Sequence, residues 1–255
     1  MRIAIIGAGN VATVLARSFT LSGQIITSVS ASTISSAKAL AVETGSTAVE
    51  INNIPVSDLI FIAVNDDAIE GVVNEISSST SALVVHVAGS KPLQILQKFK
   101  RAGVFYPLVS LTGKMIAFPA GAPVLVEARS GDDAETLTHL AQTIGALAER
   151  ATSEDRFVLH LSAVFANNFS NYLLHCAYDL LEKHNLNFSL LLPLIKQTFE
   201  KISATDPIEH QTGPAARNDL KLMKKHLEYL KNDNSKERIY NSISEEIIKL
   251  KHEQK

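Results

Sequence analysis

The sequence opens with an apolar run, Arg2-Ile3-Ala4-Ile5-Ile6, that leads directly into the segment GAGNVA. The run is short, β-branched and unbroken, which is typical of a parallel strand covered on both faces. Gly7, Gly9 and Ala12 follow with the spacing G-x-G-x-x-A, and apolar residues then recur at helical intervals. This order predicts a strand, a tight turn and a helix.

Short apolar runs alternate with helical stretches as far as about Arg150, which predicts βαβ units and a parallel sheet. The later strand-like runs cover residues 25–29, 59–64, 83–86, 104–106 and 124–127. Beyond Ser153 the strand signals stop, and helical patterns cover residues 157–184, 190–202, 218–231 and 235–251. We therefore predict an α/β fold: a dinucleotide-binding domain over 1–152 and an all-helical domain for substrate binding and dimerisation over 153–255.

The glycine segment has the spacing of a dinucleotide-binding turn. In such folds the first glycine permits a tight turn, the second lets the backbone approach a pyrophosphate, and the third small residue lets helix and strand pack closely. A purely structural turn is the alternative. The motif follows the first strand, opens a helix and precedes further βαβ units, so cofactor binding is favoured. The residues expected at the pyrophosphate are Gly7, Ala8, Gly9, Asn10, Val11 and Ala12.

The segment after the second strand indicates which cofactor is preferred. Folds that prefer NAD usually carry Asp or Glu about 20 residues past the glycines, but the first acidic residue of this chain is Glu43. Hydroxyl groups can accommodate a 2′-phosphate where no carboxylate repels it, and Ser30, Ser32 and Thr33 supply such hydroxyls here. We therefore predict NADP, although a serine-rich surface loop is the alternative and Lys38 is the only basic residue nearby.

Two further strand ends should face the same crevice, because ligands of open parallel sheets bind outside the carboxyl ends of the strands. Asp66 or Asp67 is expected to cap the next helix, Gly89 to allow close approach of a nicotinamide, and Ser90 to offer a hydroxyl. His86 is interpreted as a hydrogen-bonded structural residue. The cofactor contacts predicted from these strand ends are Val64, Asn65, Asp66, Ala88, Gly89 and Ser90.

Composition excludes several classes of protein. With 24 basic and 26 acidic residues the charge is nearly balanced, so neither nucleic acid nor an anionic membrane is an expected partner. No apolar stretch approaches the roughly 18–20 residues of a membrane span, and Met1 leads straight into the first strand, so a soluble cytoplasmic protein is expected. The single cysteine, Cys176, excludes an internal disulfide and a multi-cysteine metal site; we interpret it as a buried small apolar residue.

The order of motifs resembles known proteins. GAGNVA, FIAVNDDAI and HVAGS are similar to segments of pyrroline-5-carboxylate reductases and deazaflavin-dependent NADP oxidoreductases. The whole chain is more specifically similar to a family labelled "putative NADP oxidoreductase", through HVAGS, YPLVSLTG, LSAVFANNFSNYLL and TGPAARNDLKLMKKHLEYL. The resemblance implies a Rossmann-type sheet and a helical C-terminal domain of the 6-phosphogluconate dehydrogenase type, which mediates dimerisation in similar reductases.

Polar residues interrupt the otherwise apolar helix expected over 157–184. His160, Asn167 or Asn168, and Asn171 recur at helical intervals and can share a face, as expected for either a lined cavity or a structural polar stripe. Related hydroxyacid dehydrogenases use a lysine and an asparagine there, but no lysine occurs between Arg150 and Lys183.

The segment 212–219 is the other candidate for substrate binding. Thr212 and Asn218 can cap, and Arg217 can hold an anionic substrate. The catalytic hypothesis assigns Arg217 to a substrate carboxylate, Asn168 to the carbonyl or imine, and His160 or His226 to the proton.

These residues favour an NADP-dependent reductase that acts on a carbonyl or imine of a small acid, with substrate between the two domains. A nucleotide-binding sensor or structural protein without turnover is the main alternative, and an enzyme exchanging hydride with a deazaflavin is a narrower one. A homodimer is expected through the helical half, with Ile239, Ile243, Ile247 and Leu250 as an added apolar stripe.

Overall fold

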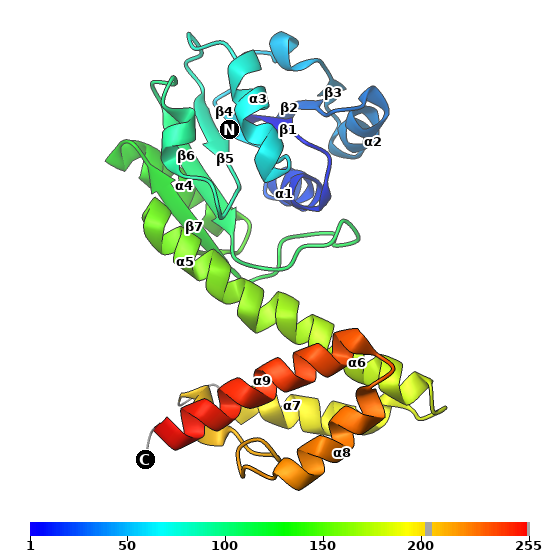
Figure 1. Ribbon diagram of the computed structural model, residues 1–255. Coiled ribbons are helices and arrows are strands. Elements are labelled where there is room, and N and C mark those ends of the chain that lie inside the picture. The colour runs from blue at the N-terminus through cyan, green and yellow to red at the C-terminus, as the bar shows by residue number, and fades with distance from the viewer. Residues whose placement is uncertain (202–205, 254–255) are drawn as a thin grey trace. The chain divides into compact units, whose positions relative to one another are not determined.

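The computed structural model describes residues 1–201 and 206–253, with side chains as far as Lys251 at the C-terminal end. The chain forms two compact units, Met1–Asn167 and Asn168–Lys255 (Figure 1). We call them the sheet unit and the helical unit. The boundary expected near Ser153 falls at the start of the last helix of the sheet unit, so the compact units divide later along the chain.

One eight-stranded sheet forms the centre of the sheet unit, in the order β3-β2-β1-β4-β5-β6-β7-β8. Its strands are β1 (Arg2–Ile6), β2 (Ile25–Ser30), β3 (Thr47–Ala48), β4 (Leu59–Ile62), β5 (Leu83–His86), β6 (Ala102–Pro107), β7 (Pro123–Ala128) and β8 (Leu147–Arg150). Every strand expected from the apolar runs is present. The two short edge strands β3 and β8 were not predicted.

The strands β1 to β6 are parallel, as predicted, but β7 pairs antiparallel with β6. The prediction of a wholly parallel sheet is therefore wrong at β7, while β8 pairs parallel with β7. A parallel connection needs a crossover, usually a helix. Residues 108–122 between β6 and β7 contain no helix, so the chain returns in the opposite direction.

Helices cover both faces of the sheet (Figure 1). They are α1 (Asn10–Leu21), α2 (Ile34–Thr44), α3 (Ile69–Glu75), α4 (Gly131–Thr143) and α5 (Ser153–Ala163), with short 3-10 turns η1 (Ile51–Asn53), η2 (Asp66–Ala68) and η3 (Leu93–Leu96). Because side chains alternate along a strand, Ile3 and Ile5 of β1 pack with α1, α2 and α4, whereas Ala4 and Ile6 pack with α3 and η3. This two-sided burial explains the unbroken apolar runs.

The helical unit contains α6 (Ser170–Glu182), α7 (Leu192–Lys201), α8 (Leu220–Leu230) and α9 (Asn234–Glu253), with 3-10 turns η5 (Phe188–Leu191) and η6 (Pro207–His210). The four predicted helical segments are present with shifted ends, and residue 202 lies outside the described residues. The single helix expected over 157–184 is divided, because a π-helical turn, η4 (Val164–Phe169), separates α5 from α6.

Cys176 corrects one expectation. Its side chain is partly exposed, and it lines an apolar cavity of about 330 Å³ together with Leu173, Ile239 and Ile243. The prediction that Cys176 is buried was wrong, because an apolar stretch of helix is buried only where another element packs against it. In the described part of the chain, no helix is both long and apolar enough to cross a membrane.

Candidate functional site

A cavity of about 630 Å³ lies at the carboxyl ends of β1, β2 and β4. Gly7 and Gly9 line it after β1, Ser32 and Ser36 after β2, and Val64 and Asn65 after β4. The three strand ends converge because the strands are adjacent and parallel. The crevice predicted from the sequence is therefore present as a cavity at three of the expected strand ends, whereas the residues that follow β5 do not line it.

Gly7 and Gly9 serve different purposes. Gly7 has a φ of +126°, and a Cβ there would lie 2.1 Å from the Ala63 carbonyl oxygen, so the fold itself requires glycine. Gly9 is the N-cap of α1, with a φ of −79° and no side-chain cap. A Cβ at position 9 would meet no protein atom within 4 Å.

The N-terminus of α1 therefore faces open space beside the cavity. Uncapped backbone N–H groups at a helix N-terminus favour an anion. Ala12 is fully buried, as the close packing of α1 on the sheet requires. The structure thus fits the pyrophosphate of a dinucleotide, while the individual contacts predicted for Ala8, Val11 and Ala12 stay predictions.

Asn10 has a partner that the sequence did not reveal. Its Oδ1 accepts a hydrogen bond of 2.9 Å from the Gly113 N–H. Arg17 donates to the carbonyl oxygens of Gly113 and Met115 at 2.7 and 2.9 Å. The long β6–β7 connection is therefore fixed to α1, and the backbone N–H and the side-chain Nδ2 of Asn10 are left for the predicted cofactor contact.

The hydroxyl groups after β2 differ in exposure. Ser32 and Ser36 line the cavity, and Thr33 caps α2 by accepting from the Ser36 N–H at 3.3 Å. The Ser30 hydroxyl is buried without a partner, and the Ser30 carbonyl oxygen accepts the Gly7 N–H at 2.7 Å. The predicted roles of Ser30 and Thr33 remain untested, and Ser32 and Ser36 are the hydroxyls that reach the cavity.

Asp66 and Ser90 join the ends of β4 and β5, since the Ser90 hydroxyl donates to the Asp66 carboxylate. Neither of the first-turn carboxylates, Asp66 and Asp67, makes a side-chain capping bond at η2, contrary to expectation. Asp66 does not cap because its carboxylate accepts the Ser90 hydroxyl instead. The cofactor contacts predicted for Val64, Asn65, Asp66, Ala88 and Ser90 stay predictions.

His86 is a structural residue, as predicted. Its side chain is fully buried, and its Nδ1 accepts the Ala88 N–H at 3.2 Å. Burial, together with the positive charge of Arg156, lowers the pKa of His86 to about 3. The imidazole is therefore neutral at pH 7.

Tyr106 and His160 meet above Gly89. The Tyr106 hydroxyl and His160 Nδ1 are 2.9 Å apart. A Cβ at Gly89 would lie 2.7 Å from the Tyr106 ring and 2.9 Å from the His160 ring, so Gly89 makes room for these rings. This packing is a second reason for a glycine at this position, and the predicted approach of a nicotinamide to Gly89 stays a prediction. Burial and the nearby Asp66 charge raise the pKa of Tyr106, so its phenol is protonated at neutral pH.

A buried arginine anchors the helix that carries His160. Arg156 lies one turn before His160, pairs with the Glu127 carboxylate and donates to the Lys91 carbonyl oxygen at 2.6 Å. Ser153 adds a bond of 2.8 Å to Glu127. The start of α5 is therefore attached to β7. One turn further along the same helix, His160 contacts Tyr106 near the end of β6.

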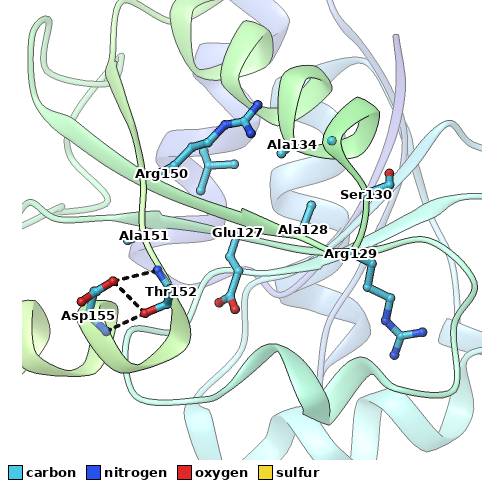
Figure 2. A pocket seen from close by; sticks show the side chains of 11 residues that line it. Glu127, Ala128, Arg129, Ser130, Ala134, Arg150, Ala151, Thr152 and Asp155 are labelled. Carbon is cyan, nitrogen blue, oxygen red and sulfur yellow. Dashed lines mark hydrogen bonds between the residues drawn. The ribbon is translucent and has the colours of Figure 1, made fainter.

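A second cavity of about 360 Å³ lies where α4 and α5 begin, shown in Figure 2. Arg129, Arg150 and two helix N-termini line it, which is a common arrangement for anion binding. However, Ser130 caps α4, and a reciprocal capping box between Thr152 and Asp155 caps α5 (Figure 2). The helix starts already have acceptors, unlike the start of α1.

The remaining predicted catalytic residues belong to the helical unit. Asn168 and Arg217 are exposed, and His226 Nδ1 lies 2.8 Å from the Tyr240 hydroxyl, which links α8 to α9. The π turn η4 lies between His160 and Asn168, so the helix between them is not regular, and their predicted pairing stays a prediction. Asp219 caps α8 through the Leu222 N–H at 3.1 Å, in place of Asn218. The catalytic grouping of His160, Asn168, Arg217 and His226 stays a prediction.

Comparison with known proteins agrees with this fold. Residues 2–89 match the family "NADP oxidoreductase coenzyme F420-dependent", and residues 122–247 match a domain of unknown function, DUF2520. A "putative NADP oxidoreductase" from Bacteroides fragilis is 34% identical, with a TM-score of 0.87 over 97% of this chain and 98% of that one. The chain belongs to this NADP oxidoreductase family.

More distant structures share the fold. An imine reductase from Myxococcus stipitatus in complex with NADP⁺ is 15% identical, with a TM-score of 0.69 over 99% of this chain and 93% of that one. A 1-pyrroline-5-carboxylate reductase from Streptococcus pyogenes is 15% identical, with a TM-score of 0.64 and 98% coverage of both chains. No curated protein sequence matches the chain.

Proposed function

We propose that the protein is an NADP-dependent reductase of a carbonyl or imine group in a small acidic metabolite. The observation that carries this proposal is the uncapped, glycine-lined N-terminus of α1 beside a cavity large enough for part of a dinucleotide. The Tyr106–His160 pair supplies titratable groups near the carboxyl ends of β5 and β6, in the same sheet. When bound, the cofactor would supply the hydride, and the chain would position the nucleotide and provide the proton.

The preference for NADP rests on the hydroxyl groups after β2. Ser32 and Ser36 face the cavity, and no acidic residue precedes Glu43 to repel a 2′-phosphate. Titration calorimetry should show tighter binding of NADPH than of NADH. Ser32→Asp should weaken NADPH and spare NADH, because the new carboxylate repels only the phosphorylated ribose, whereas Ser32→Ala controls for loss of the hydroxyl. Equal affinities in the unmodified protein would refute the preference.

The substrate class follows from Arg217, an exposed guanidinium directly before α8. Its fork of donors suits a carboxylate, and lysine does not reproduce that geometry. A screen of 2-oxo acids and cyclic imino acids with NADPH should find turnover, and Arg217→Ala should raise KM more than Arg217→Lys. Asn168→Ala and His226→Ala test the remaining predicted roles, orientation of the reacting group and proton supply. Unchanged kinetics in a variant would remove that residue from the site.

A nucleotide-binding sensor is the second candidate, favoured by the absence of a lysine between Arg150 and Lys183. It predicts tight NADPH binding with no turnover across the whole panel. Failure to bind either nucleotide would instead refute both candidates.

We also propose a homodimer formed through the helical unit. Leu190 and Leu194 are 71% and 58% exposed, and Ile243 of the predicted α9 stripe is 42% exposed. Exposed apolar area on this scale marks an interaction surface. Light scattering at micromolar concentration should give the mass of a dimer. Ile243→Glu should shift the mass toward a monomer, while Ser242→Glu, an exposed neighbour on the same helix, should not.

A further inference from the structure

Tyr106 and His160 form a pair of titratable side chains. From the sequence, His160 was considered as a proton source, but no role was assigned to Tyr106. The ring of Tyr106 stands at the end of β6, next to the end of β5, and both rings are packed on Gly89. The hydroxyl of Tyr106 is half-buried and 2.9 Å from His160 Nδ1. Ordinary packing does not require a polar pair here, because a phenylalanine ring would fill the same space above Gly89.

The charges around the pair suit proton transfer. His160 is partly exposed and can exchange protons with solvent through its second ring nitrogen. The groups that act on the phenol are His160 from α5, Asp66 from η2 and Arg156 from α5. Asp66 in turn accepts the Ser90 hydroxyl, so the carboxylate is held in place beside the strand ends. Burial and the Asp66 charge raise the pKa of the phenol against the opposing charge of Arg156, so the phenol has a proton available at neutral pH.

We propose that Tyr106 is the proton donor of the reductase reaction and that His160 restores its proton. This inference rests on the proposed function. As the substrate carbon accepts hydride from the reduced nicotinamide, which is thereby oxidised, the C=N or C=O π bond breaks. Its electron pair takes the phenol proton, giving an amine or alcohol and a phenolate. His160 takes a proton from solvent at Nε2 and passes its Nδ1 proton to the phenolate, so Tyr106 is the catalytic residue and His160 positions and reloads it.

The test compares Tyr106→Phe with Tyr229→Phe in the full chain. Tyr229 forms a similar pair with His184 in the helical unit, so its variant controls for loss of a Tyr–His hydrogen bond. Tyr106→Phe should lower kcat by about 10²- to 10⁴-fold, the usual contribution of a positioned acid. KM and the NADPH dissociation constant should change little, and Tyr229→Phe should keep full activity. Full kcat in Tyr106→Phe would overturn the assignment.

A second measurement needs no turnover. Ultraviolet titration of the unliganded protein, minus that of Tyr106→Phe, isolates the ionisation of this phenol. The difference should titrate above the ordinary value of 10.0, and His160→Asn should change its midpoint. An ordinary midpoint that is insensitive to His160 would overturn the pairing.

The two proposals fail in different ways. If the unmodified protein binds NADPH but reduces no substrate, the reductase function falls and the proton donor falls with it. If turnover is found and survives in Tyr106→Phe, only the assignment of Tyr106 falls.

Discussion

The sheet unit and the helical unit bury apolar side chains to very different extents. In the sheet unit both faces of the sheet are covered, and residues such as Ile3, Phe19 and Leu59 have no exposed surface. In the helical unit the described apolar side chains that are buried are only Ala215, Met223 and Leu230, and none lies on α6 or α7. The sheet unit therefore contains a well-buried core of its own, whereas the helical unit presents exposed apolar surface, on which the proposed dimer rests.

The largest expected effect tests the rigidity of the sheet unit. Gly7→Ala should cost more than about 3 kcal/mol of unfolding free energy, because the new Cβ meets the Ala63 carbonyl and the backbone is left-handed. Gly9→Val should leave stability within about 1 kcal/mol, since open space surrounds that position. It should nevertheless weaken NADPH binding by about 100-fold, or about 2.7 kcal/mol.

Urea denaturation and calorimetry on the two glycine variants measure these effects. Gly9→Val protein that binds NADPH normally would show that the α1 turn is not the nucleotide site.

Arg156 tests how the sheet unit holds α5. Its side chain is 1% exposed, and Arg156→Met would remove the positive partner of the Glu127 carboxylate and the donor to the Lys91 carbonyl. Breaking a buried pair in this way should cost about 3 kcal/mol in urea denaturation. Arg150→Met is the matched control, because the Arg150–Glu135 pair is 58% and 77% exposed and should contribute less than about 1 kcal/mol. Similar losses in both variants would mean that Arg156 does not anchor the helix.

The same contrast between the units explains what the sequence could predict. Buried parallel strands appear in the sequence as unbroken apolar runs, so β1, β4 and β5 were found with nearly correct ends. The turn at Gly7 was predictable because its spacing reflects local backbone geometry. The direction of β7 was not, since it depends on a 15-residue connection whose lack of a helix is a weak signal.

Tyr106 was missed for a physical reason. It lies 54 residues from His160, and their meeting depends on how Arg156 attaches α5 to β7. The usable signals were its place at the end of a predicted strand and a glycine, Gly89, at the end of the neighbouring one. The π turn between His160 and Asn168 was also missed, because no residue pattern identified it.

Acid should weaken the sheet unit through His86. Its pKa is about 3 in the folded protein against 6.5 when unfolded, so the unfolded chain binds more protons between these values. Stability should fall by up to about 1.4 kcal/mol for each pH unit below 6.5, down to about pH 3. His86→Asn should flatten this slope, whereas His139→Asn, on the exposed side of α4, should not. An unchanged slope in His86→Asn would assign the acid sensitivity elsewhere.

The smallest effect concerns the ion pairs of the helical unit. Lys236 Nζ lies 2.5 Å from the Asp179 carboxylate and 2.7 Å from that of Asp233. Hydrogen bonds from Lys236 lower the pKa of Asp233 to about 2, and the same bonds raise the pKa of Lys236. A depressed carboxyl pKa contributes stability above the ordinary value of 3.8 that is lost as pH falls toward 2. A raised lysine pKa contributes below 10.5 and is lost above it.

These ion pairs should therefore contribute a constant amount to the stability of the helical unit between about pH 4 and 10. In the acid part of this range, below pH 6.5, the sheet unit already loses the contribution of His86. Hydrogen exchange of α6 and α9 should be flat over this range after correction for intrinsic rates, while exchange in β4 and β5 should accelerate below pH 6.5. Lys236→Gln should raise exchange in α9 slightly at pH 7 and by less at pH 2, because about half of the Asp233 carboxyl groups are then protonated. Faster exchange in α9 than in β5 between pH 6 and pH 4 would reverse the expected order of acid sensitivity of the two units.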